Sequence, residues 1–333
     1  MYQQQAYAKT TYSSYQSGIR CYLNFLAMSG RMSTHTSSTS DIESTLIHFV
    51  THCASNLQVC HTTIKCYLAG VRYYFISNGL RNPFNDATQP LHLLELTLKG
   101  IRRSQTSHIS RTRLPVTTPV LHSICSILDT GFHSPYLDAL LKAACTLAFF
   151  GFLRCSEFTT RTKSFDATVH LCLTDIVFHC HHGLPTEFHL HLKESKTDPF
   201  RQGTTILISA VQGIICPVRA MSRYLTARRP LDTDPFSPLF LLPLSHQALD
   251  RHTFITHFRQ VLDHTAYDAS LYSGHSFRSG GATTSSAARV PDHLIQTLGR
   301  WSSQAYRLYI HTPPDTIRRA QRALAAITHR DLH

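Results

Sequence analysis

Long apolar segments are missing from this 333-residue sequence, and acidic residues are few. No stretch approaches the roughly 18 to 20 apolar residues that a membrane-spanning helix needs. The first residues, MYQQQAYAKTTYSSY, also lack the basic, apolar and small-residue order of a signal peptide. These absences predict a soluble intracellular protein without a membrane partner.

The ten cysteines do not follow the spacing of a disulfide framework. They lie mostly inside apolar segments and form no Cys-x-x-Cys pair, which indicates buried thiols in a reducing compartment. The stretch FHCHHG, His179 to His182 around Cys180, is a possible zinc site, but the flanking segments alternate as strands and predict a hairpin tip there. A tetrahedral site needs spaced ligands from two elements. We therefore expect no metal and no cofactor, with a histidine-rich metal protein as an alternative.

Basic residues outnumber acidic ones by 32 to 20, which gives a formal net charge of +12 with histidine neutral. An excess of this size favours a polyanionic partner, nucleic acid first and an anionic membrane surface second. A generally basic soluble protein without such a partner is the alternative.

Hydrophobic periodicity predicts a mainly α protein of two domains. Apolar residues recur at helical spacing in four segments, which predicts a compact helical domain over 5–105. A polar linker follows over 106–117, and a second domain over 118–312 is helical with three short strands around 174–180, 186–193 and 204–208. These strands predict a small antiparallel sheet inserted in the second domain. The remaining residues, 313–333, form an amphipathic tail that docks on its own domain or on a neighbouring molecule.

Several residues with phosphate or proton chemistry follow one another along the second domain. Arg154 ends an apolar helix with Glu157 one turn later, so it either reaches the surface or is held inward by that carboxylate. Lys196 lies in a turn-rich hairpin tip between the second and third strands. His275 and Arg278 share one face at the start of a helix, where free N–H groups favour a phosphate.

Near the end of this domain, the stretch LGRWSSQAYRLYIHTP carries Trp301, Tyr306 and Tyr309. Tyrosines on a terminal amphipathic helix more often pack than react. The small residues Gly280 and Gly281 allow another backbone to approach the preceding helix closely. Taken singly, none of these signals is specific.

Taken in order, the set resembles the tyrosine recombinase (phage integrase) family. The resemblance rests on FGFLRCSEF, SKTDPFRQG, GHSFRSGGAT and LGRWSSQAYRLYI, and it covers nearly the whole chain. These motifs are especially similar to eukaryotic mobile-element recombinases of the DIRS and Crypton kinds. The family implies a helical core-binding domain, a linker and a catalytic domain with an inserted sheet.

The resemblance also implies a reaction. Arg154 and Arg278 would hold the non-bridging oxygens of a DNA phosphate, and Tyr309 would attack it to give a 3′-phosphotyrosyl link and a free 5′-hydroxyl. His275 would assist the proton transfer from the tyrosine, and Lys196 would protonate the leaving oxygen. No metal or ATP is required. The partner would be double-stranded DNA, bound by a dimer on one site and a tetramer on two, in the nucleus if the chain is a eukaryotic mobile-element protein.

Two positions depart from the family pattern or leave a choice. The family usually has His or Trp nine residues before the nucleophile, and this chain has Arg300 there; we favour Trp301 for that role, with Arg300 as the alternative. Spacing from the preceding glycine favours Tyr309 over Tyr306 as the nucleophile. Glu157 would orient Arg154, or else be a simple acid on the helix surface.

A group of basic residues flanks the linker, where a DNA clamp would cross the DNA backbone. The alternative is a solvated basic linker. Three other functions stay open: a type IB topoisomerase, a telomere resolvase, and a domesticated DNA-binding protein that no longer cuts. The predicted DNA-binding residues are Lys99, Arg102, Arg103, Arg111 and Arg113.

Overall fold

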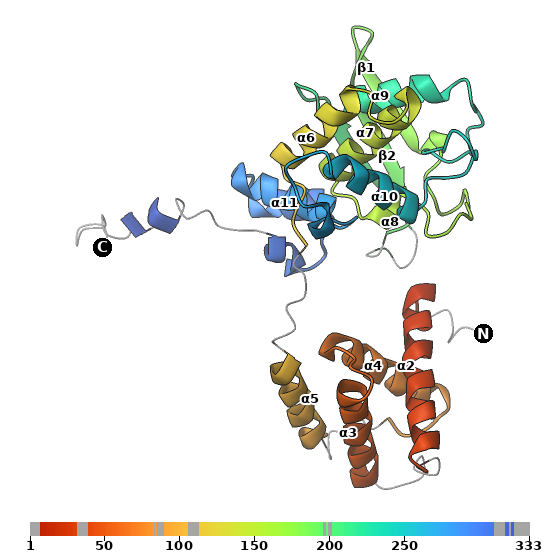
Figure 1. Cartoon of the computed structure of the whole chain (residues 1–333), viewed down its shortest axis with the longest axis vertical. Coiled ribbons are helices and arrows are strands. Elements are labelled where there is room, and N and C mark those ends of the chain that lie inside the picture. Colours follow the sequence, from red (N-terminus) through yellow and green to blue (C-terminus); the bar gives the residue numbers. More distant parts are fainter. Residues whose placement is uncertain are drawn as a thin grey trace. The chain divides into compact units, whose positions relative to one another are not determined.

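The structure is a computed structural model that divides the chain into two compact units, Met1–Ser110 and Arg111–His333 (Figure 1). It describes residues 7–31, 39–82, 84, 90–105, 113–195, 198, 202–309, 317–319 and 321–322. The architecture is mainly helical with a small three-stranded antiparallel sheet, as the sequence predicted. Within the described ranges, no helix combines the length and the apolarity needed to cross a membrane.

Helices α2 (Lys9–Met28), α3 (Thr39–Ser55), α4 (His61–Ser77) and α5 (His92–Ser104) make up the described part of the first unit. Helices α2 and α4 approach closely because each carries a glycine at the crossing. A Cβ on Gly18 would lie 2.6 Å from Tyr67 Cα, and one on Gly70 would lie 2.6 Å from Tyr15 O. The core between the helices includes Leu26, Leu46, Phe49, Val71 and Phe75.

Helix α5 is held at its beginning by a residue of α3. The Glu43 carboxylate accepts hydrogen bonds from the backbone N–H groups of Leu93 (2.9 Å) and Leu94 (3.1 Å), which the helix itself leaves without partners. Further along α5, Leu94 and Ile101 face the core. The basic residues Lys99, Arg102 and Arg103 are exposed on the same helix.

The second unit is built around α7 (Pro135–Phe150), which is buried almost along its whole length. Its sequence, PYLDALLKAACTLAFF, is apolar on nearly all sides, and such a helix belongs in a core. Ser134 begins it by accepting a hydrogen bond from Leu137 N at 3.3 Å. Around it lie α6 (Thr118–Asp129), α8 (Cys155–Phe158), α9 (Pro217–Arg228), α10 (Arg251–Leu262), α11 (Ser276–Ala287) and α12 (Asp292–Leu298).

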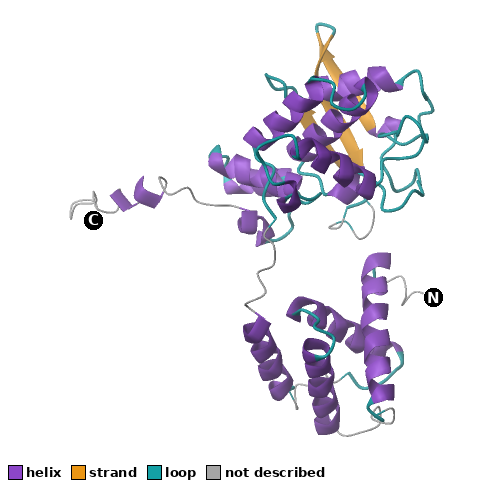
Figure 2. Ribbon diagram, viewed as in Figure 1, coloured by secondary structure: helices purple, strands orange, loops and turns teal. Residues whose placement is uncertain are grey.

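The sheet runs in the order β1 (Ile176–His181), β2 (Leu184–Leu192) and β3 (Thr204–Ser209), with both pairs antiparallel. Figure 2 shows it in orange among the helices of the second unit. Each strand end lies within two residues of its predicted position. His182 and Gly183 join β1 to β2 with φ values of 50° and 77°, the left-handed pair typical of a tight hairpin turn. The predicted hairpin tip at FHCHHG is therefore confirmed.

The histidines of this hairpin do not gather into a metal site of three or more ligands. His179 Nε2 lies 3.2 Å from His189 Nδ1 across the strands. In the described part of the chain, no group of three or more His, Cys, Asp or Glu side chains is placed to hold a metal ion.

Residues 113–117, which the sequence analysis placed in the linker, are packed into the second unit. Leu114 N donates to Leu271 O and Val116 N donates to Ser276 O, both at 2.8 Å. Val116 is fully buried, and a Cβ on Gly280 would lie 1.9 Å from its carbonyl oxygen. The small residues of α11 thus admit a backbone of this same chain, and the linker ends earlier than predicted because Val116 is an apolar core residue.

Candidate active site

The turn between α7 and α8 holds the first arginine of the predicted set beside a carboxylate. Arg154 Nη1 donates to Glu157 Oε1 at 2.8 Å, and Arg154 N donates to Glu157 Oε2 at 2.9 Å. The Glu157 side chain is only 2% exposed, and that of Arg154 is 19% exposed. Arg154 is therefore held inward by a buried carboxylate, and Glu157 is not a surface acid.

The second arginine of the set, Arg278, is almost completely buried in the first turn of α11. Its Nη1 donates to Phe152 O at 2.7 Å, its Nη2 donates to Gly299 O, and the guanidinium lies over the Trp301 ring, 4.3 Å from the centroid. Burial and then the charge of Arg154 lower the pKa of Arg278 to about 9. Among the described side chains, no carboxylate forms an ion pair with it.

Tyr309 and His275 are in direct contact although 34 residues separate them. His275 Nε2 lies 2.7 Å from Tyr309 Oη, within hydrogen-bond reach. His275 immediately precedes α11 and is exposed, and Tyr309 ends the 3-10 helix η6 (Gln304–Tyr309) and is half-buried. Thr283 on α11 also donates to the Tyr309 carbonyl at 3.0 Å, which anchors the tyrosine backbone.

Tyr306 lies in a small apolar cluster and not beside the histidine. It is 4% exposed and packs with Phe152, Ile295 and Trp301. The Trp301 ring lies 6.3 Å from that of Tyr306 and 5.8 Å from that of Tyr309, measured between centroids. Trp301 therefore packs against the tyrosine helix and also contacts the Arg278 guanidinium.

Arg300 points into the protein. Its Nη2 donates to Glu157 Oε2 at 3.0 Å, and its Nη1 donates to Gly151 O at 2.9 Å. The side chain is 11% exposed, and burial lowers its pKa while Glu157 opposes that change. Of the two residues considered for the His/Trp position, Arg300 binds Glu157 and Trp301 stacks on Arg278.

Lys196 and Arg111, both predicted as site residues, lie outside the described residues. The described lysine nearest to Lys196 along the chain is Lys193. It could act as the leaving-group acid in place of Lys196 only by giving up its present partners. Its Nζ lies 2.6 Å from Asp175 Oδ2 and 2.8 Å from Ala167 O. Lys193 therefore ties the end of β2 to the segment before β1.

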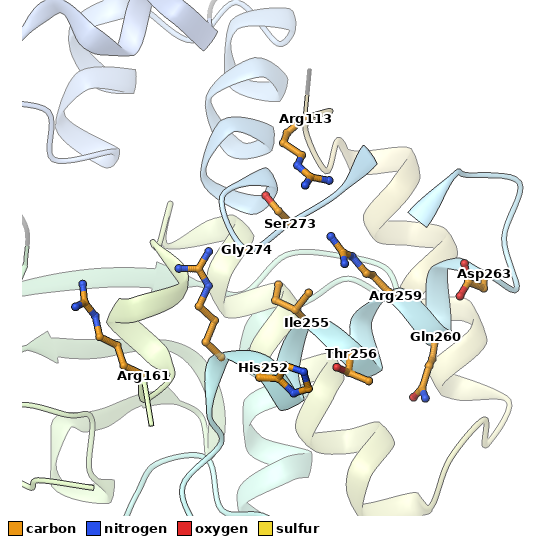
Figure 3. Close-up of a pocket in the computed structure, with 11 residues that line it drawn as sticks. Arg113, Arg161, His252, Ile255, Thr256, Arg259, Gln260, Asp263, Ser273 and Gly274 are labelled. Carbon is orange, nitrogen blue, oxygen red and sulfur yellow. The ribbon is translucent and has the colours of Figure 1, made fainter. Parts of the chain in front are cut away.

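A pocket of about 660 Å³ has Ser273 and Gly274, the two residues that precede His275 in the sequence, in its wall (Figure 3). Figure 3 shows the guanidinium groups of Arg113, Arg161 and Arg259 around it. Arg113 was predicted as a DNA contact, whereas the other arginines of the pocket were not. In α10, Arg251 and Arg259 lie eight residues apart on one helical face, so the spacing of these two arginines was the signal in the sequence. The pocket arginines are Arg113, Arg161, Arg251 and Arg259.

These groups together suit a phosphoryl-transfer reaction. A tyrosine hydroxyl touches a proton acceptor, and two guanidiniums from different elements are held in place nearby. Fixed donors aimed at developing negative charge stabilise a transition state without reorganising during the reaction. A nucleophile hydrogen-bonded to a base is the arrangement expected of covalent catalysis.

Comparison with solved structures gives the fold independently of these motifs. No protein-family model and no curated protein matches the sequence. The chain is similar to the XerH site-specific recombinase bound to palindromic difH in a post-cleavage complex, with a TM-score of 0.62, 16% identity, and 94% of this chain and 79% of that chain covered. It is also similar to a lambda integrase dimer bound to a COC′ core site (TM-score 0.52, 12% identity, 92% and 72% covered).

A third similar structure is the Tn1549 transposon integrase in complex with transposon right-end DNA, with a TM-score of 0.50, 14% identity and 85% of each chain covered. Because the sequence identities are only 12–16%, these similarities show the fold alone. The described structure, mainly helical with its small antiparallel sheet, has the fold of these site-specific recombinases and integrases.

Proposed function

We propose that this chain is a tyrosine-type site-specific DNA recombinase that cuts and rejoins DNA through a covalent 3′-phosphotyrosine. The observation that carries the proposal is the 2.7 Å contact between His275 Nε2 and Tyr309 Oη, close to the held guanidiniums of Arg154 and Arg278. A tyrosine hydroxyl needs a proton acceptor to attack at neutral pH, because its ordinary pKa is about 10.

In the proposed reaction, Tyr309 Oη forms a bond to the phosphorus of a DNA phosphodiester. The bond from phosphorus to the 5′ oxygen breaks, and the DNA 3′ end stays linked to the tyrosine. The phenolic proton passes to His275, and Lys196 supplies a proton to the departing 5′ oxygen. The phosphoester energy is kept in the new bond, so another 5′-hydroxyl can reverse the step.

The charge state of Arg278 supports an anionic substrate. Its guanidinium is buried against two carbonyls and an indole ring; no described carboxylate forms an ion pair with it, and the nearby Glu157 charge only partly opposes the lowering of its pKa. A buried cation without a counter-ion is unfavourable unless something supplies the opposite charge. A bound phosphate would do so and would raise the depressed pKa of Arg278.

The arginine-lined pocket supports a long anionic partner rather than a single small phosphate. Four arginines border it next to Gly274, one residue from His275. Such a group can neutralise several phosphates along a DNA backbone. The structures with similar folds are themselves complexes with DNA sites. Lys99, Arg102 and Arg103 on α5 would add contacts from the first unit.

Trapping of the covalent intermediate tests the proposal. The purified protein is incubated with a library of nicked suicide duplexes, and denaturing gels and sequencing then detect protein linked to a DNA 3′ end. We expect a metal-independent adduct that Tyr309→Phe abolishes and Tyr306→Phe retains. An adduct that survives Tyr309→Phe would refute this nucleophile. No adduct, together with salt-sensitive DNA binding, would favour a non-cutting DNA-binding protein.

Finer features of the proposal rest on the sequence resemblance. We propose a dimer on one DNA site and a tetramer on two, a nuclear location, and an origin in a DIRS- or Crypton-type mobile element. Exchange of strands between two sites would distinguish a recombinase from a type IB topoisomerase, which only relaxes DNA, and from a telomere resolvase, which closes hairpins.

A further inference from the structure

Arg300 occupies a backbone position that usually takes glycine. Helix α12 ends in a pair of capping bonds, Arg300 N to Thr297 O at 3.0 Å and Trp301 N to Gln296 O at 3.1 Å. In this arrangement the residue at position 300 is left-handed, and its φ is +54°. Glycine adopts that conformation without the steric strain that a Cβ introduces. The backbone alone therefore does not favour an arginine.

The adjacent glycine cannot take over this position. A Cβ on Gly299 would lie 1.5 Å from Cζ3 of the Trp301 ring, so glycine is needed at 299 to seat the tryptophan. Gly299 itself has a right-handed backbone (φ −81°), and the left-handed conformation is found at residue 300. An arginine stays in this strained backbone conformation only where contacts with the surrounding structure offset the strain.

The contacts of the Arg300 side chain connect it, through Glu157, to Arg154. Arg300 Nη2 and the Arg154 backbone N–H share one oxygen of Glu157, while Arg154 Nη1 binds the other oxygen. Arg300 also donates to Gly151 O, in the turn that precedes Arg154. Both oxygens of the Glu157 carboxylate thus accept hydrogen bonds, three in all, and these fix its orientation.

The shared carboxylate also changes the charge available at Arg154. One carboxylate beside one guanidinium leaves a neutral pair, which attracts a phosphate weakly. With Arg300 as a second cation on the same carboxylate, the three groups carry a net charge of +1. The Glu157 side chain is 2% exposed, so water screens this effect little.

We propose that Arg300 is a positioning residue that acts through Glu157: it fixes the carboxylate that orients Arg154 and offsets its negative charge, so that Arg154 meets the DNA phosphate as an effective cation. This inference rests on the proposed function. Arg300 itself does not touch the DNA, since the described donor contacts of its guanidinium head, to Glu157 and to backbone carbonyls, all run into the protein.

Three substitutions of Arg300 separate the effect of its side-chain contacts from the effect of its strained backbone. Arg300→Gly removes the side chain and relieves the left-handed strain, so the fold is kept while the contact with Glu157 is lost. Arg300→Gln keeps the strain and loses the charge. Arg300→Lys keeps the charge and can bind Glu157 but cannot also reach Gly151 O with a second fixed donor.

The assay is single-turnover cleavage of a suicide duplex, with DNA affinity measured separately. We expect Arg300→Gly and Arg300→Gln to slow cleavage about tenfold, less than the ~10²–10³-fold loss typical for a donor that touches the reacting oxygens. Arg300→Lys should recover part of the rate. DNA affinity should fall far less than the cleavage rate, because Arg154 is one of many contacts to the DNA backbone, whereas its charge acts directly on the reacting phosphate in the transition state.

A double-mutant cycle with Glu157→Gln tests the route of the effect. If Arg300 acts through Glu157, the loss caused by Arg300→Gln should largely disappear in the Glu157→Gln background. Equal losses in both backgrounds would overturn the inference, as would a wild-type cleavage rate in folded Arg300→Gly. Failure of the wild-type protein to form any adduct would instead count against the proposed function, which keeps the two outcomes distinct.

Discussion

The arginine-lined pocket predicts a specific change in the salt dependence of DNA binding. Arg161 and Arg251 border the pocket, both are exposed, and neither forms an ion pair among the described residues. Two such guanidiniums are free to neutralise phosphates. We therefore expect Arg161→Gln combined with Arg251→Gln to weaken DNA binding at low salt and to make it less sensitive to salt.

The magnitude follows from the number of charges removed. Each phosphate neutralised contributes a slope of about −0.9 in the logarithm of affinity against the logarithm of salt concentration, so losing two contacts reduces the slope by about 1.8. Between 50 and 200 mM salt, a fourfold change, the affinity ratio of the parent to the double variant should then shrink by about 12-fold.

Fluorescence anisotropy with labelled duplex DNA measures these slopes, in a Tyr309→Phe background so that binding stays reversible. Arg219→Gln with Arg229→Gln is the matched control, because both arginines are exposed in or next to α9, neither forms an ion pair among the described residues, and neither lines the pocket. Parallel salt plots for the parent and the pocket variant would refute the assignment of this surface to DNA. An equal change in the control would show that only net charge matters.

Three further predictions concern the site and its scaffold. Protonated Arg278 is present below its pKa of about 9 and is lost above it, so kcat/KM for cleavage should fall as pH rises through about 9; a flat profile from pH 8 to 10 would contradict this. His275→Ala should slow single-turnover cleavage by about 10²–10⁴-fold with little change in DNA affinity, and an unchanged rate would exclude it as the proton acceptor. Gly280→Ala should lower the free energy of unfolding in urea by about 1–3 kcal/mol, since its Cβ would meet the Val116 carbonyl, whereas Gly100→Ala, with nothing within 4 Å, should raise it by about 0.5–1 kcal/mol; equal effects would refute the packing argument.

Two predicted site residues stay predictions at the level of sequence. Lys196 and Arg111 lie outside the described residues, so the proposed leaving-group acid and one proposed DNA contact rest on the resemblance alone. Most of the tail over 313–333 also lies outside them. Trapping experiments with Lys196→Ala on a substrate with a better leaving group at the 5′ position would test the first of these roles.

The sequence by itself determined the elements and the types of chemical group. The apolar stretch before Arg154 predicted helix α7, and the alternation of apolar and polar residues predicted the strands, because both patterns are local features of the sequence. The motifs around Arg154, His275 and Tyr309 predicted phosphate and proton chemistry because those side chains have few alternatives for it.

Only the tertiary structure decided which of these groups meet. Tyr306 and Tyr309 are three residues apart in the same helical segment, yet one is buried beside Trp301 and the other reaches His275. The contact of Arg300 with Glu157 spans 143 residues. No local pattern fixes such pairs, since they depend on how α8, α11 and η6 pack together, and that packing is set by side chains from the whole unit.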